Sequence, residues 1–85
     1  MDRIVFDVRT KRTTAKRNYG SYISTLRVNG VKLYSMPYSS TATNELINMF
    51  FQRNNHSLDR GDGHGYSLIQ IKDAPTHQIF TAERE

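Results

Sequence analysis

The dipeptide Asn29-Gly30 separates two short runs rich in β-branched, aromatic and leucine residues, within the segment SYISTLRVNGVKLYSMPY over residues 21–38. Both residues tolerate the positive φ angles of a tight two-residue turn, so the segment predicts a β-hairpin. Such a turn also sets the register, because side chains alternate between the two faces along each strand. The predicted pairs are Val28 with Val31, Arg27 with Lys32, Leu26 with Leu33, Thr25 with Tyr34 and Ile23 with Met36.

This register gives the hairpin two different faces. An apolar face, suited to a core, carries Val28, Val31, Leu26, Leu33 and Tyr22. The other face carries Arg27, Lys32, Tyr34, Thr25 and, further out, Tyr38. Like charges directly opposite each other disfavour strand pairing, so the pair Arg27 and Lys32 indicates an anionic partner.

Apolar periodicity predicts the remaining elements. A strand is expected over Arg3–Arg9, with Ile4, Phe6 and Val8 on one face, and it should pair with the hairpin. A polar, basic loop follows it over residues 10–21.

A helix is predicted over residues 41–53, where a Ser- and Thr-rich start precedes an apolar stripe of Leu46, Ile47, Phe50 and Phe51. A turn-rich loop, a strand over residues 66–72 and a weaker strand signal over residues 78–82 complete the chain. The order β-β-β-α-β, with an optional last strand, predicts an α+β fold. In this fold one helix packs on one face of a mainly antiparallel sheet of four to five strands.

Length and composition bound the functional classes. The 85 residues predict a single domain over residues 1–85, and the absence of cysteine excludes a disulfide framework and a thiolate site. The sequence shows no long apolar run and no signal-peptide pattern near its start, so a cytoplasmic protein without membrane contact is expected.

The charge of +4 is unevenly distributed along the chain. Residues 1–40 hold eight Lys or Arg against two Asp, whereas residues 41–85 hold four against six acidic residues. A basic half of this kind attracts nucleic acid or an acidic protein surface. The predicted binding residues are Lys11, Arg12, Lys16, Arg17, Arg27, Lys32, Tyr34 and Tyr38.

These features predict a small non-enzymatic protein that binds nucleic acid, or nucleic-acid-bound machinery, through a basic sheet face and loop. Lys and Arg would neutralise phosphates, and Tyr34 would stack on unpaired bases. The alternative is an inhibitor or adaptor that blocks a host protein, as anti-defence proteins among phage accessory proteins do. Its partner would be an acidic surface of a nucleic-acid-processing complex. No cofactor is expected in either case.

The loop over residues 54–65 offers two further alternatives. Its His56, Asp59, Asp62 and His64, with His77 elsewhere, are possible metal ligands, but they lack cysteine and regular spacing, so no metal site is predicted. A nuclease with His64 as base and Arg60 as phosphate clamp is the nearest enzymatic interpretation, yet no catalytic motif is present. Arg60-Gly61-Asp62 matches the integrin-binding tripeptide, which is short enough to arise by chance.

The stretch YISTLRVNGVKLYSMPYSSTATNELINMFF, over residues 22–51, resembles the DNA-binding domains of phage integrases and plant AP2-type factors. These domains combine a three-stranded sheet of basic strands and a tight turn with an amphipathic helix. The stretch lacks their Trp and Gly positions, and a further strand is predicted over residues 66–72. The resemblance therefore implies a shared arrangement of elements and assigns no role to any residue.

Overall fold

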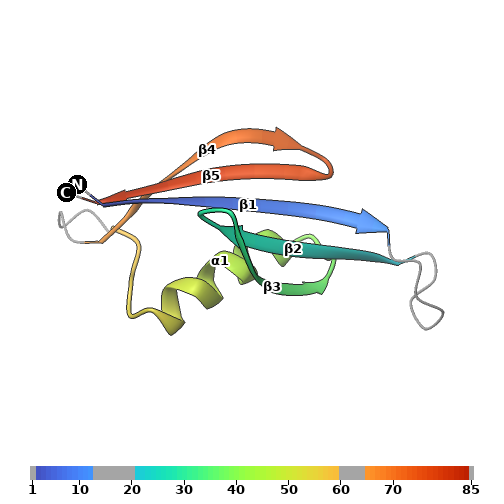
Figure 1. Cartoon of the computed structure of the whole chain (residues 1–85), viewed down its shortest axis with the longest axis horizontal. Helices are drawn as coiled ribbons and strands as arrows, with labels where there is room; N and C mark the ends of the chain where they lie inside the picture. The colour runs from blue at the N-terminus through green and yellow to red at the C-terminus, as the bar shows by residue number, and fades with distance from the viewer. Residues whose placement is uncertain (1, 13–20, 60–64, 85) are drawn as a thin grey trace.

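A computed structural model describes residues 2–12, 21–59 and 65–84 of the chain. Their elements are β1 (Asp2–Arg12), β2 (Tyr22–Val28), β3 (Val31–Pro37), α1 (Ala42–Arg53), β4 (Ser67–Ala74) and β5 (His77–Arg84). The strands form one sheet in the order β3-β2-β1-β5-β4, and all neighbouring strands are antiparallel. The molecule is elongated, 47 × 24 × 22 Å, and the start of β1 lies beside the end of β5 (Figure 1).

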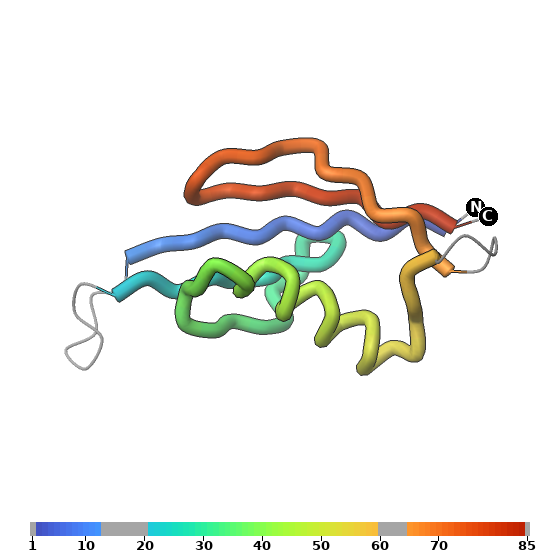
Figure 2. The backbone as a smooth tube through the Cα atoms, turned by 180° about the vertical axis from the view of Figure 1, so that it is seen from behind, coloured from blue at the N-terminus to red at the C-terminus, as the bar shows by residue number. Residues whose placement is uncertain are grey.

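The predicted α+β fold is confirmed, including the optional fifth strand and the single helix on one face of the sheet (Figures 1 and 2). Helix α1 begins one residue later than predicted and ends at Arg53 as predicted. The predicted pairing of the first strand with the hairpin is also confirmed, because β1 pairs with β2.

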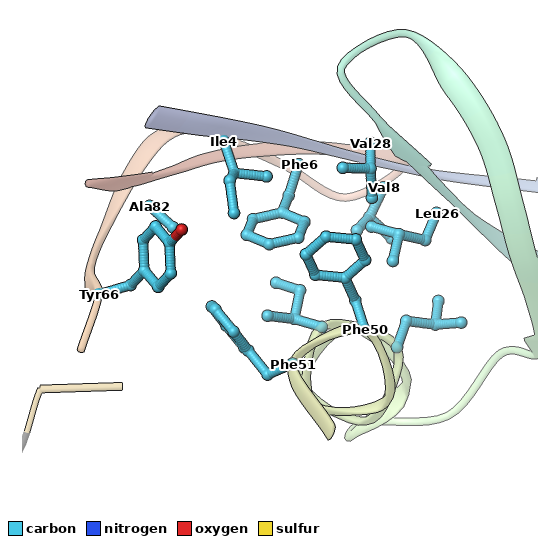
Figure 3. Packing of buried hydrophobic residues seen from close by; sticks show 11 residues of the cluster. Ile4, Phe6, Val8, Leu26, Val28, Phe50, Phe51, Tyr66 and Ala82 are labelled. Atoms are coloured by element: carbon cyan, nitrogen blue, oxygen red, sulfur yellow. The ribbon is translucent and has the colours of Figure 1, made fainter. Parts of the chain in front are cut away.

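The core lies between α1 and the sheet (Figure 3). Phe6 of β1 is fully buried, and its ring meets those of Phe50 and Phe51 edge-on at centroid distances of 5.3 and 5.6 Å. Tyr66 is also buried and its ring lies 5.9 Å from that of Phe51. Aromatic pairs in these geometries contribute beyond the burial of area. This aromatic cluster therefore fixes which side of β1 faces the helix.

Strand β1 is longer than predicted, because Thr10, Lys11 and Arg12 belong to it. The register continues through Lys11 opposite Ile23 and Arg12 opposite Tyr22. These polar residues carry no apolar period, so the sequence signal for a strand is absent there. Backbone pairing with β2 supplies the hydrogen bonds that make the segment a strand.

The predicted turn at Asn29-Gly30 is confirmed, with φ angles of 50° and 87°. Val28 pairs with Val31 and Arg27 with Lys32 as predicted, but a β-bulge follows and the next pair is Leu26 with Tyr34. The remaining predicted pairs are therefore wrong by one residue: Thr25 lies opposite Ser35, Ser24 opposite Met36 and Ile23 opposite Pro37. The extra residue in β3 is Leu33, and a bulge of this kind exchanges the faces of every later side chain.

The bulge corrects the predicted apolar face of the hairpin. Tyr34 and Met36 of β3 pack against the core, where the prediction had placed Leu33. Leu33 is 42% exposed, and Val31 and Tyr22 are exposed as well, because they lie at the sheet's edge and end. Only Leu26 and Val28 of the predicted apolar set are buried.

Candidate functional site

The side of the sheet opposite α1, here called the outer face, is defined by alternate residues of β1. Its register rows run from Arg27 through Asp7 to Ile79, and from Thr25 through Arg9 to His77. A third row joins Val5, Thr81 and Ile69 across β1, β5 and β4. The outer face is thus basic toward β2 and β3, and toward β4 it carries Ile69 and Ile79 together with Lys72.

A hollow of about 170 Å³ lies on the basic part of the outer face. Five side chains from three adjacent strands line this basic hollow: Arg9, Lys11, Thr25, Arg27 and Lys32. Their convergence follows from the register, since Arg9 lies opposite Thr25 and Arg27 lies opposite Lys32. Four cations around one small concavity create a strongly positive local potential.

Most of this charge is uncompensated. Within residues 2–12, 21–59 and 65–84, no carboxylate forms an ion pair with Lys11, Arg27 or Lys32. Arg27 and Lys32 face each other directly, which weakens strand pairing unless an anion lies between them. The guanidinium of Arg27 offers a planar fork of donors suited to phosphate or carboxylate, and the ammonium of Lys32 adds a compact point charge.

One acidic residue borders the basic hollow. The Asp7 Oδ1 atom lies 3.3 Å from Arg9 Nε and 3.0 Å from His77 Nε2, and His77 Nδ1 lies 3.2 Å from Lys72 Nζ. Partial burial opposes ionisation of Asp7, but the hydrogen bonds with His77 and Arg9 outweigh it, so the pKa of Asp7 is lowered. Asp7 therefore stays anionic at neutral pH and holds Arg9 at the edge of the hollow.

The structure brings together three of the predicted binding residues, Lys11, Arg27 and Lys32. It adds Arg9, which the sequence analysis did not select. The signal for Arg9 was its place on the polar side of a strand expected to pair with the hairpin, but selecting it required the register between the two strands. Arg12 alternates onto the opposite side of β1, next to Tyr22 in register. Lys16 and Arg17 lie outside the described residues.

Tyr34 does not belong to the basic hollow, which corrects its predicted place beside Arg27 and Lys32. The bulge at Leu33 turns Tyr34 to the helix-facing side, where the Arg53 guanidinium carbon lies 4.8 Å from the centre of its ring. A base bound over the basic hollow therefore could not stack on Tyr34.

Tyr38 lies at a second concavity on the helix-facing side of the sheet. This helix-side groove, of about 360 Å³, lies between the start of α1 and the β4–β5 hairpin. Its lining includes Tyr38, Asn44, Gln70, Asp73, Gln78 and Phe80. Tyr38 is thus separated from Lys11, Arg27 and Lys32 by the thickness of the sheet.

The loop over residues 54–65, for which no metal site was predicted, lies partly outside the described residues, and Arg60, Asp62 and His64 are among the residues not described. His56 contacts rings, with its centroid 5.1 Å from Tyr66 and 6.3 Å from Phe50. His77 is the first residue of β5 and lies against Asp7 of β1. Among residues that the structure describes, no three His, Asp or Glu side chains are grouped as metal ligands.

Comparisons with known proteins leave the site to be interpreted from its own chemistry. No protein-family model, curated protein or solved structure matches the chain. In the described part of the chain, no helix has the length and apolar character needed to cross a membrane.

Proposed function

We propose that this protein is a non-enzymatic binder of nucleic acid. The basic hollow contacts the phosphate backbone of the nucleic acid. The observation that carries the proposal is the gathering of four cations from β1, β2 and β3 on the side of the sheet that α1 leaves open. A charged surface that only kept the protein in solution would not require these four cations to gather at one place. Arg and Lys side chains bind phosphate groups through charge-assisted hydrogen bonds and release the counterions of the nucleic acid.

The corrected position of Tyr34 restricts the proposed contact. The described residues that line the basic hollow are four cations and Thr25, and none of them is aromatic. Contacts to phosphate position a protein on nucleic acid but do not read its sequence. The basic hollow on its own is therefore expected to bind with little sequence preference.

The test is a salt titration of binding to DNA, measured by fluorescence anisotropy. Arg27→Gln combined with Lys32→Gln should weaken binding and flatten the salt dependence, because each phosphate that is no longer neutralised lowers the slope by roughly 0.9 for duplex or 0.7 for single strands. The matched control is Arg3→Gln with Arg53→Gln, which lowers the net charge equally but outside the hollow. This control should keep the wild-type slope.

Two results would contradict the proposal. Equal weakening in both double variants would show that net charge, not the hollow, determines binding. No binding by the wild type to single-stranded or duplex DNA or RNA at about 50 mM salt would remove nucleic acid as the partner.

A second candidate is an acidic protein surface, favoured by the apolar row beside the basic hollow. Ile69 and Ile71 of β4 are 51% and 58% exposed, and Val5 of β1 lies in the same register row as Ile69, with Thr81 of β5 between them. Exposed apolar side chains next to cations suit a protein interface with an apolar centre and a charged rim. For an inhibitor or adaptor, Ile69→Ser should reduce capture of the partner, whereas nucleic-acid binding should be unaffected by it.

A further inference from the structure

The helix-side groove has a rigid wall built from side chains of α1, β4 and β5. Gln78 of β5 accepts a hydrogen bond of 2.6 Å from the Thr43 hydroxyl of α1 and donates one of 3.2 Å to Asp73 Oδ1 of β4. These bonds tie the first turn of α1 to the β4–β5 hairpin across one side of the groove. The groove is consequently a preformed feature of the fold, and its volume of about 360 Å³ falls within the range of small-ligand sites.

The groove combines flat apolar surfaces with amide and carboxylate groups. Tyr38 is 54% exposed and Phe80 is half-buried, so both rings have accessible surface. The Asn44 side chain makes no hydrogen bond to any described residue, and Gln70 makes a long one of 3.5 Å to the Lys72 carbonyl. Amides of this kind offer donors and acceptors side by side, and Asp73 supplies a further acceptor.

This chemistry suits an unpaired nucleobase. A base has an apolar face that stacks on aromatic rings and an edge of alternating donors and acceptors that amides can match. Asp73 would repel a phosphate in the same place. The groove and the basic hollow therefore differ in the part of a nucleotide that each can accept.

The two concavities lie on opposite sides of one stretch of β1. Val8 and Thr10 line the groove, whereas Arg9 and Lys11 line the basic hollow. Pairing between β1 and β5 ends at Arg9 opposite His77, and the Thr10 amide donates to the Thr76 carbonyl at the β4–β5 turn. Beyond this turn no described strand pairs with that edge of β1 (Figure 1), so a single strand that reached both concavities would pass around this edge.

We propose that the helix-side groove binds a nucleobase of a single strand whose phosphates contact the basic hollow. This inference rests on the proposed function and makes it specific for single-stranded nucleic acid. Tyr38 stacks on the base, while Asn44, Gln70 and Asp73 contact its edge.

The experiment compares a short single-stranded oligonucleotide with an abasic strand that has the same number of phosphates, by fluorescence anisotropy at low salt. The wild type should bind the strand with bases roughly tenfold more tightly, the change expected from one base-stacking contact. Tyr38→Ala should abolish this difference and leave the salt-dependent binding of the abasic strand intact. Tyr22→Ala, which alters another exposed tyrosine outside the groove, should behave as the wild type.

The outcomes separate the two proposals. Equal affinity of the wild type for both strands, or equal losses in Tyr38→Ala and Tyr22→Ala, would overturn the base site while leaving phosphate binding in place. Tighter binding to a duplex of the same length would also overturn it. Failure of the wild type to bind either strand would remove the groove's role, and failure to bind duplex DNA and RNA as well would remove the proposed function.

Discussion

The helix-facing and outer sides of the sheet are built from alternate residues of the same strands, yet they differ in burial and in charge. On β1, Ile4, Phe6 and Val8 are buried under α1, while the intervening Val5, Asp7 and Arg9 remain on the outer face. The helix-facing side is stabilised by packing, which tolerates little change. On the outer face, Lys11, Arg27 and Lys32 form no ion pair with a carboxylate of any described residue, and the facing pair Arg27 and Lys32 opposes strand pairing. This concentration of one sign of charge on the outer face is the observation on which the proposed nucleic-acid binding rests.

The largest expected effect is on the helix-facing side. Phe6→Ala should lower the free energy of unfolding by about 3–5 kcal/mol, because it leaves a cavity among Phe50 and Phe51. The outer-face control Ile69→Ala should cost less than about 0.5 kcal/mol, since Ile69 is half exposed. Urea unfolding measures both changes.

A small domain can fail to fold with such a cavity, so a milder variant keeps the comparison measurable. Ile47→Val, also in the core, should cost about 0.5–1.5 kcal/mol. Losses from Ile69→Ala that match those from either core variant would mean that the outer face is packed against something, contrary to the comparison.

Replacing Tyr34 tests directly which side of the sheet this residue faces, and the expected loss of stability is intermediate. Tyr34→Ala should lower the free energy of unfolding by about 1–2 kcal/mol, because Tyr34 packs on the core and contacts the Arg53 guanidinium. The affinity of this variant for nucleic acid, measured by anisotropy, should equal that of the wild type. Reduced affinity without reduced stability would place Tyr34 on the outer face and refute the bulge at Leu33.

The smallest effect concerns the charges of the outer face. The pKa of Asp7 is lowered because its hydrogen bonds with His77 and Arg9 outweigh partial burial. A carboxyl with a lower pKa in the folded than in the unfolded state stabilises the fold above about pH 4, and this contribution is lost as the pH falls through the folded-state value. Thermal unfolding of the wild type should therefore shift to lower temperature on acidification below about pH 4.

Asp7→Asn should reduce this acid-dependent loss, and adding Asp2→Asn should reduce it further, since the hydrogen bond from Arg84 lowers the pKa of Asp2. The differences should shrink at high salt, because both carboxylates are accessible to solvent. An acid-induced loss in Asp7→Asn as steep as in the wild type would show that Asp7 is not stabilised in the folded protein.

The sequence by itself determined the order of the elements and the apolar side of the first strand, of the second strand and of the helix. Asn29-Gly30 fixed the hairpin turn, and the spacing of Phe50 and Phe51 from Leu46 and Ile47 fixed the helix face, because both signals act over a few residues. The alternation of Phe6 with Asp7 likewise marked the two sides of the first strand. From these the α+β fold and a basic outer face followed.

Only the tertiary structure decided how the strands align. The bulge at Leu33 leaves no local sequence signal, because it depends on where Tyr34 and Met36 meet the core under α1. The extension of β1 through Lys11 depends in the same way on pairing with β2. These registers place Arg9 in the basic hollow, turn Tyr34 away from it and put Tyr38 at a separate groove. Contacts between residues far apart in sequence determine all three positions. The hydrophobic pattern along a single strand therefore does not predict them.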